Sequence, residues 1–330
     1  MLISRTPFRI SLFGGGTDLS VWLDQSPGKV FSFAINKYCF ITLRELSEFF
    51  NYKYAITYHK REHVNKIEDI KHPVVKNLLK IFEKKTRFEI EHKSDLPARS
   101  GIGSSSTFTV GLLNSLNFYK KNFLSKKKLC NLAINFEQNI LKENVGMQDQ
   151  IRASYGGIGF INFKKNKFQV NNILKSHRIT QELEKNCFLV YTDIARTSSK
   201  VEKKKIQLLK KNIEAKNNMK KIYEIACEAE EIIKSENYEI KDIGMLLSEQ
   251  WKFKKNLLRS ISNNKIEEIY DFVMTCGAYG GKLLGAGAGG FFIFLGNDRV
   301  IKKIKFKNTR LKVLKIKIDY LGSIVFETKL

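Results

Sequence analysis

The chain has 330 residues, of which 43% are hydrophobic and 12% aromatic, a composition typical of a globular protein with a sizeable core and not of a disordered one. No apolar run reaches the roughly 18 residues that a membrane span requires, and the first residues lack the pattern of a signal peptide. The five cysteines are scattered without a Cys-x-x-Cys pair, which argues against disulfides and a zinc site. We therefore expect a cytoplasmic protein without a membrane partner.

The formal net charge of +25 allows two interpretations. A strongly basic chain can bind nucleic acid. Alternatively, the lysines form a solvated surface, because they are spread along the chain and are not gathered in one tail. We favour the second interpretation and expect no nucleic-acid partner, although a basic surface also suits small polyanions.

The first half of the chain is predicted to be rich in strands. Apolar and polar residues alternate in two segments, and β-branched and aromatic residues dominate two others. These patterns predict strands over 8–12, 29–46, 53–59 and 87–94. A helical period of apolar residues predicts a helix over 73–85.

The second half mixes longer helices with short strands. Apolar periodicity predicts helices over 125–144, 198–236, 246–260 and 264–277, the first of them broken by Gly146. Strands are predicted over 158–163, 185–195, 289–296, 310–318 and 323–328. Because helices and strands do not alternate strictly, we predict an α+β architecture in two parts, residues 1–175 and 176–330.

A glycine-serine segment lies between the strand 87–94 and the next apolar helical pattern. It contains Gly101, Ile102 and Gly103, followed by Ser104, Ser105 and Ser106. The first turn of a helix leaves backbone N–H groups unpaired, and glycines let such a backbone approach an anion closely. The segment therefore predicts a phosphate site, although it lacks the lysine of a Walker A loop. The alternative is a serine-rich helix cap.

A second glycine cluster, GAGAGG, begins at Gly285. Gly285, Gly287 and Gly290 match G-x-G-x-x-G, but a helical pattern precedes them and a strand pattern follows, which is the reverse of a dinucleotide-binding unit. We reject dinucleotide binding here. The cluster is either a tight turn into a strand or a place where backbone approaches a ligand, through positions such as Gly287 and Gly289.

A third cluster and two acids complete the candidate site. Gly14, Gly15 and Gly16 follow the first strand and lead to Thr17 and Asp18, an acid that turns and helix caps also use. Further along, Glu137 lies near the apolar side of its helix and Asp149 follows a glycine break. A carboxylate pair beside a phosphate site is what Mg²⁺ and a hydroxyl nucleophile require.

Together, the three glycine segments resemble those of the GHMP kinase superfamily, named for galacto-, homoserine, mevalonate and phosphomevalonate kinases. In family order they read TPFRISLFGGGTD, PARSGIGSSS and LLGAGAGGFF. The resemblance implies an α+β, two-domain GHMP kinase fold, with an N-terminal ribosomal-protein-S5-like α/β domain and a C-terminal ferredoxin-like α+β domain. It also implies ATP and Mg²⁺ as cofactors and an alcohol group of a small molecule as acceptor.

The same resemblance implies roles for individual residues. ATP phosphates would lie on Gly101–Ser106, and Mg²⁺ on Ser105 and Glu137. Asp149 matches the catalytic aspartate of galactokinase-like members, with Arg9 as its partner. Asp18 matches the acid that holds sugar hydroxyls, beside Gly15, Gly16 and Thr17. Galactokinases carry Glu-His where this chain has Gly15 and Gly16, which argues for a sugar other than galactose.

More narrowly, RTPFRISLFGGGTDLSVWL, GMQDQIRASYGGIGFINF and ARTSS resemble the D-glycero-D-manno-heptose 7-phosphate kinases. That group phosphorylates the anomeric hydroxyl of a sugar phosphate, giving a 1,7-bisphosphate for nucleotide-activated heptose in surface polysaccharides. Fucokinase-type and galactokinase-like sugar 1-kinases are the alternatives. The resemblance leaves room for a homodimer. Arg99, Arg196, Lys29 and Lys282 adjoin loops that should face the cleft, so they are either ligands of the substrate phosphate or surface charges.

Overall fold

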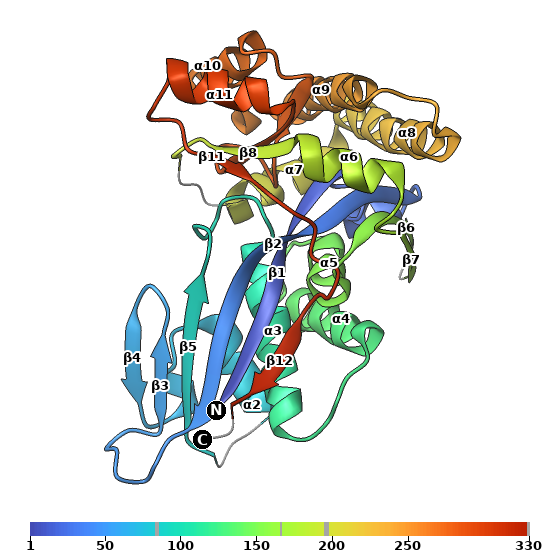
Figure 1. Ribbon diagram of the computed structural model, residues 1–330. Helices are drawn as coiled ribbons and strands as arrows, with labels where there is room; N and C mark the ends of the chain where they lie inside the picture. Colours follow the sequence, from blue (N-terminus) through green and yellow to red (C-terminus); the bar gives the residue numbers. More distant parts are fainter. Residues whose placement is uncertain (83–85, 166, 195–197, 329–330) are drawn as a thin grey trace.

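The computed structural model describes the chain except residues 83–85, 166, 195–197 and 329–330 (Figure 1). Its first half is built on an eight-stranded sheet with the strand order β12-β1-β2-β5-β3-β4, to which β6 and β7 are added beside β2. Only β3 and β5 pair in parallel among these strands. The strands are β1 Leu2–Phe13, β2 Gly28–Glu45, β3 Tyr54–Thr57, β4 Arg61–Val64, β5 Phe88–Ser94, β6 Ile158–Lys164, β7 Lys167–Asn172 and β12 Ile324–Glu327.

The long strand β2 organises this sheet. It is antiparallel to β1, to β6 through residues 28–33 and to β5 through residues 39–45. Its buried aromatic residues explain why it is so long, because Phe31 stacks on Phe160 with ring centroids 4.5 Å apart and Phe33 is buried beside it. In Figure 1, β1 and β2 run from the end that holds both termini to the second half.

Helices cover one face of this sheet. α3 and α5 pack directly on β1 and β2, while α2 and α4 pack against α3. The central helix α3 is buried on most of its circumference, which is expected of a helix rich in small and apolar residues. The elements are α1 Ser20–Leu23, η1 Ile67–Asp69, α2 Pro73–Phe82, α3 Ser104–Tyr119, α4 Lys126–Asn135, the π-helical turn η2 Phe136–Ile140 and α5 Gln148–Tyr155.

The second half contains a four-stranded antiparallel sheet with the order β11-β8-β10-β9. α9 packs on β9 and β10, and α8 reaches β1 and β2 of the first sheet. Two sheets with separate helical layers confirm the predicted α+β class. The elements are α6 Arg178–Asn186, β8 Cys187–Tyr191, α7 Ser198–Lys211, α8 Ile213–Ser235, α9 Ile240–Leu257, η3 Arg259–Ile261, α10 Asn264–Thr275, β9 Gly280–Leu283, β10 Phe291–Leu295, α11 Asp298–Lys307 and β11 Val313–Lys315.

The end of the chain returns to the first sheet, because β12 pairs antiparallel with β1. The Thr6 and Ser323 hydroxyls, 2.8 Å apart, join the same two segments. The last strand, β12, thus belongs to the sheet of the first part. The division of the chain at residue 175 stays a prediction. No helix in the described ranges is long and apolar enough to cross a membrane.

The helices α1, α5, α6 and α11 were not predicted from the sequence. α11 buries Val300, Ile301 and Ile304, and the Asn297 side chain caps it by accepting from the Val300 amide at 3.3 Å. Lysines surround these three apolar residues in the sequence, so the helical period of the apolar residues is too short to be recognised. α6 has the same character. The strand predicted over 310–318 is shorter, since β11 covers only Val313–Lys315.

Candidate active site

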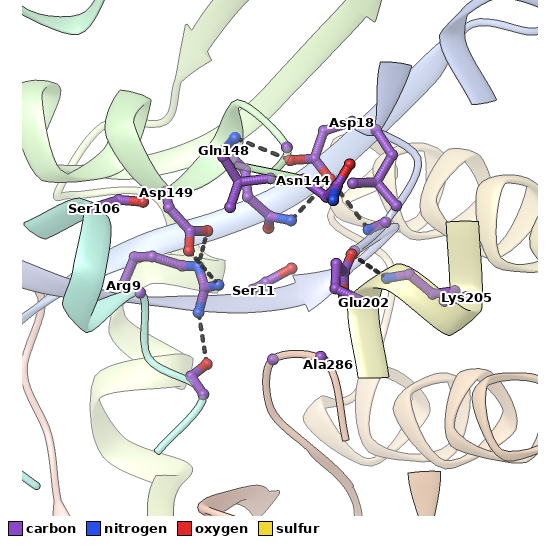
Figure 2. A pocket seen from close by; sticks show the side chains of 18 of the residues that line it. Arg9, Ser11, Asp18, Ser106, Asn144, Gln148, Asp149, Glu202, Lys205 and Ala286 are labelled. Atoms are coloured by element: carbon purple, nitrogen blue, oxygen red, sulfur yellow. Dashed lines mark hydrogen bonds and ion pairs between the residues drawn. The ribbon is translucent and has the colours of Figure 1, made fainter. Parts of the chain in front are cut away.

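A cavity of about 600 Å³ opens where the glycine segments of both halves meet (Figure 2). The end of β1, the start of α3 and the start of α5 form one side, and α7, α9 and β9 contribute from the second half. This volume is in the range of small-molecule sites. The predicted residues that line it are Arg9, Gly15, Gly16, Asp18, Arg99, Gly101, Gly103, Ser104, Ser105, Ser106, Asp149 and Lys282.

Arg9 and Asp149 form a bidentate ion pair inside this cavity. Arg9 Nε donates to Asp149 Oδ1 at 2.6 Å and Nη2 donates to Oδ2 at 2.9 Å. Figure 2 shows the two side chains facing each other, from β1 and from the first turn of α5. Two parallel charge-assisted bonds fix both the position and the orientation of the carboxylate. The structure thus brings together the two residues that the sequence pairs.

The glycine-serine segment lies directly against this pair. Gly103 has φ +77°, and a Cβ at this position would lie 3.1 Å from Asp149 Oδ2, so the loop approaches the carboxylate without a side chain in between. Gly103 caps α3 without a side-chain hydrogen bond, which leaves the amides of the first turn available. Arg9 Nη1 donates to the Gly101 carbonyl at 2.7 Å. Ile102 is fully buried and anchors the loop from below.

Glu137 is held by Ser106 and not by Ser105. The Ser106 hydroxyl donates to Glu137 Oε2 at 2.8 Å, and the Gln150 side-chain amide also donates to this oxygen. Ser105 lines the cavity with an exposed side chain, so of the two serines it is Ser106 that contacts Glu137. Glu137 lies in the π-helical turn η2, a feature that is frequent at functional sites.

The surroundings of Glu137 suit a divalent cation. The carboxyl is fully buried, and burial raises its pKa to about 7, although nearby hydroxyl and amide donors oppose the shift. Its Oε1 atom has no hydrogen-bond partner among the residues that the structure describes. A buried carboxylate with one unpaired oxygen, next to a hydroxyl at the cavity wall, fits Mg²⁺. In the described ranges, no group of three histidine, cysteine or acidic side chains forms a cation site by itself.

Asp18 is fixed at the other end of the cavity. Its Oδ2 accepts from the Gln148 amide at 3.0 Å, and its Oδ1 accepts from the Gln148 side chain at 2.9 Å and from the Gly16 amide at 3.2 Å. Burial raises the pKa of this carboxyl. Gly146 packs against the carboxylate so closely that a Cβ there would lie 1.9 Å from Oδ2. Asp18 is thus a rigid acceptor and not an exposed cap residue.

Thr17 has a structural role that the sequence did not indicate. It does not line the cavity, and its hydroxyl donates to the Gly14 carbonyl at 2.8 Å. The Lys29 amide donates to the same hydroxyl at 3.1 Å. Thr17 therefore ties the glycine turn to β2 and positions its neighbours Gly16 and Asp18. We no longer expect its side chain to contact a ligand.

The GAGAGG segment contributes differently from the prediction. Gly285 and Ala286 line the cavity, whereas a Cβ at Gly287 would lie 2.7 Å from Ile261 and one at Gly289 would lie 2.5 Å from the Ile194 carbonyl. Gly287 and Gly289 thus pack against protein and not against the cavity. The close packing of this loop requires glycine at both positions, because a side chain there would clash with Ile261 or with the Ile194 carbonyl.

The candidate phosphate ligands separate into different environments. Lys282 is buried at the cavity wall, and Arg99 lies exposed at its edge with φ +60°. Lys29 forms an ion pair with Glu230 outside the cavity lining, which removes it from the candidates. Arg196 lies outside the described residues.

Several cavity residues were missed by the sequence analysis. Gln148 is part of the quoted GMQDQ motif, so attention to its amide would have found it. Gln250, Lys254, Glu202 and Lys205 come from helices far along the chain and carry no local motif. Lys205 pairs with Glu202 at 2.6 Å, as Figure 2 shows. Only the fold brings them to the glycine segments.

Comparison with known proteins gives this geometry a family. Residues 70–157 match the GHMP kinases N terminal domain. The chain is 31% identical over 303 residues to a D-glycero-alpha-D-manno-heptose 7-phosphate kinase of Campylobacter jejuni, with 88% of each chain aligned. The chain belongs to the GHMP kinase family. As a GHMP sugar kinase, it is an ATP-dependent phosphotransferase.

The kinase is also similar to a second protein in sequence and to a solved structure in fold. A bifunctional fucokinase/GDP-fucose pyrophosphorylase of Arabidopsis thaliana is 26% identical over 314 residues, which are 88% of this chain and 29% of that one. A solved structure described as a D-glycero-D-manno-heptose 1-phosphate kinase from Bacteroides thetaiotaomicron superposes with a TM-score of 0.78 at 23% identity, covering 100% of both chains. The whole kinase therefore has the GHMP kinase fold.

Proposed function

We propose that this kinase transfers the γ-phosphoryl group of ATP to the anomeric C1 hydroxyl of D-glycero-D-manno-heptose 7-phosphate. The product would be the 1,7-bisphosphate, an intermediate for nucleotide-activated heptose in surface polysaccharide. The observation that carries the proposal is the bidentate Arg9–Asp149 pair, which faces the uncapped start of α3 across Gly103. The similarity to the Campylobacter jejuni heptose 7-phosphate kinase supports this choice of sugar.

Asp149 acts as the general base in this proposal. It accepts a hydrogen bond from the C1 hydroxyl and takes its proton as the oxygen attacks phosphorus. Arg9 orients the carboxylate, because two parallel charge-assisted hydrogen bonds fix both of its oxygens. The amides from Gly103 to Ser106 hold the phosphate oxygens. Catalysis then comes mainly from positioning and from neutralisation of charge.

Ser106 and Glu137 would hold Mg²⁺, and the sequence-based choice of Ser105 becomes a contact to phosphate. When bound, the cation neutralises phosphate charge during transfer. Asp18 accepts hydrogen bonds from sugar hydroxyls beside the Gly15 and Gly16 backbone. Arg99, exposed at the edge of the cavity, is our candidate for the distal sugar phosphate.

A kinase assay over a panel of sugars tests the proposal. The purified protein with MgATP would be offered heptose 7-phosphate, unphosphorylated heptose, fucose, galactose and mannose. We expect turnover with heptose 7-phosphate to exceed that with the other sugars, and phosphorus NMR to show a new anomeric phosphate. Turnover of fucose in preference would assign the kinase to the fucokinase type, and phosphorylation away from C1 would refute the regiochemistry.

A further inference from the structure

A buried lysine faces the cavity without a partner of opposite charge. Lys282 lies on β9, where it pairs with Ile293 of β10, and only 3% of its surface is exposed. It nevertheless lines the cavity. Within the described part of the chain, its ammonium group makes no ion pair or side-chain hydrogen bond. A buried cation of this kind is costly unless something compensates its charge.

The surroundings of Lys282 increase this cost. Burial and, to a smaller extent, the positive charge of Arg9 together lower its pKa to about 7. Asp149 is already paired with Arg9 through both carboxylate oxygens, and among the described residues it forms no ion pair with Lys282. The site therefore holds two neighbouring cations and one carboxylate. This part of the cavity therefore suits an anionic ligand.

The other cations of the cavity have partners or lie in solvent. Lys205 pairs with Glu202 at 2.6 Å, and Lys254 donates to the carbonyls of Leu283 at 2.6 Å and Gly285 at 2.7 Å. Arg99 and Lys142 are exposed. The described cavity lining thus provides one buried ammonium that is open to a ligand.

The contacts of Arg9 indicate that the anion near Lys282 is a phosphate group of the nucleotide. The Arg9 guanidinium donates to Asp149 and to the Gly101 carbonyl, and so orients both the base and the phosphate loop. These N–H groups are therefore already used within the protein. The negative charge of a phosphoryl group that enters beside Arg9 must therefore be neutralised by another residue. Lys282, on β9 of the second half, lines the same cavity as Arg9 and Asp149 and lies near enough to Arg9 for the two charges to interact.

We propose that the Lys282 ammonium contacts the oxygens of the phosphoryl group during its transfer and is a catalytic residue of this kinase. The inference rests on the proposed function and extends it. Lys282 contributes no proton and forms no covalent bond. It stabilises the negative charge on the equatorial oxygens while the bond to ADP breaks and the bond to the sugar oxygen forms.

The test compares Lys282→Met with the unchanged enzyme. Removing a buried charge should leave the melting temperature equal or higher, while kcat falls about 100-fold or more, as when one transition-state donor is removed. The KM for the sugar should change little. In direct binding, a non-hydrolysable ATP analogue should lose about tenfold in affinity while ADP, which lacks the terminal group, keeps its affinity. Lys312→Met, the same change at an exposed lysine over the Tyr191 ring and outside this cavity, is the control.

The outcomes separate this inference from the proposed function. A kcat within threefold of the unchanged enzyme, or equal losses for ADP and the ATP analogue, would overturn the role of Lys282. A loss confined to phosphorylated sugars, with full activity on their unphosphorylated forms, would also overturn it and place the distal sugar phosphate there. If the unchanged enzyme phosphorylates no sugar of the panel, the proposed substrate fails, while the nucleotide-binding comparison still tests Lys282. Lys282→Gln repeats the comparison if the methionine variant does not fold.

Discussion

The pairing of Arg9 with Asp149 makes a direct prediction about one side chain. Asp149→Asn keeps the shape of the side chain but removes the base, so kcat should fall by about 10²- to 10⁴-fold. Calorimetry should show little change in ATP affinity, because the nucleotide contacts lie on the loop Gly101–Ser106. Steady-state kinetics that retain more than a tenth of the activity would remove Asp149 from the role of base.

Glu137 makes a second prediction at this scale. Its pKa rises from 4.5 to about 7 on folding, so between these values the folded protein binds more protons than the unfolded chain. The free energy of unfolding without metal should therefore decrease as pH rises from 4.5 to 7, by ~3 kcal/mol at most. Glu137→Gln, which does not titrate, should lack this component.

Denaturant titrations at pH 5 and pH 7.5 in a chelator measure the difference between the two proteins. Added Mg²⁺ should restore stability at pH 7.5 in the unchanged protein only. A difference that does not change with pH would show that Glu137 ionises normally. Stabilisation of Glu137→Gln by Mg²⁺ to the same extent would place the cation elsewhere.

These single residues also show how far sequence reasoning extends. Arg9, Asp149 and the loop Gly101–Ser106 belong to motifs, and the structure brings them into contact. The choice between Ser105 and Ser106 was not predictable, because adjacent residues on a helix point about 100° apart and only the fold decides which faces Glu137. Lys282 adjoins the GAGAGG motif, but its burial and missing partner are visible only in the structure.

At the scale of the elements, the two glycine loops contact each other in a way that requires glycine at position 290. Gly290 has φ +95°, and a Cβ there would lie 2.3 Å from the Ser100 carbonyl, which also accepts from the Phe291 amide at 3.0 Å. This contact holds the phosphate loop against the start of β10. Gly277 has a similar φ of +102°, but its nearest neighbour, Val300, is 3.8 Å from the Cβ position.

Gly290→Ala should therefore destabilise more than Gly277→Ala. Each substitution places alanine at a positive φ, which should cost about 1–2 kcal/mol of folding free energy. Only Gly290→Ala adds a clash with backbone. We expect Gly290→Ala to lose further stability in denaturant titrations and to raise the KM for ATP. Equal effects of the two substitutions on both measurements would show that the loops do not depend on each other.

The helix predicted over 125–144 shows why element boundaries were harder to predict than element types. Its apolar period is present, but α4 ends at Asn135 and continues as the π-helical turn η2 to Ile140. The wider turn accommodates the buried Glu137, whose partners Ser106 and Gln150 come from other helices. Local periodicity contains no information on such distant partners.

Across the whole molecule, Gln250 joins the two halves at the cavity. Its Oε1 accepts from the Gly14 amide at 2.6 Å, and its Nε2 donates to the Leu12 carbonyl at 2.8 Å, both buried. Gln250→Leu keeps the size but leaves these groups unpaired, which should lower the free energy of unfolding by about 2–4 kcal/mol. Gln207→Leu, the same change at an exposed position of α7, should have little effect.

Denaturant titration and the KM for the sugar measure both variants. Because Gln250 holds the turn that leads to Asp18, the KM should rise in Gln250→Leu as well. Equal stabilities of the two variants would mean that the halves are joined without this contact. The overall α+β class was predictable from composition and pattern, but this junction was not, since no motif marks Gln250.

The most direct test of the whole account is a crystal structure with a non-hydrolysable ATP analogue, Mg²⁺ and heptose 7-phosphate. We expect the triphosphate on Gly101–Ser106, the C1 oxygen about 3–3.5 Å from the terminal phosphorus, and Asp149 within hydrogen-bond reach of that oxygen. A nucleotide bound away from this loop, or a sugar whose hydroxyls all lie beyond reach of Asp149, would contradict it.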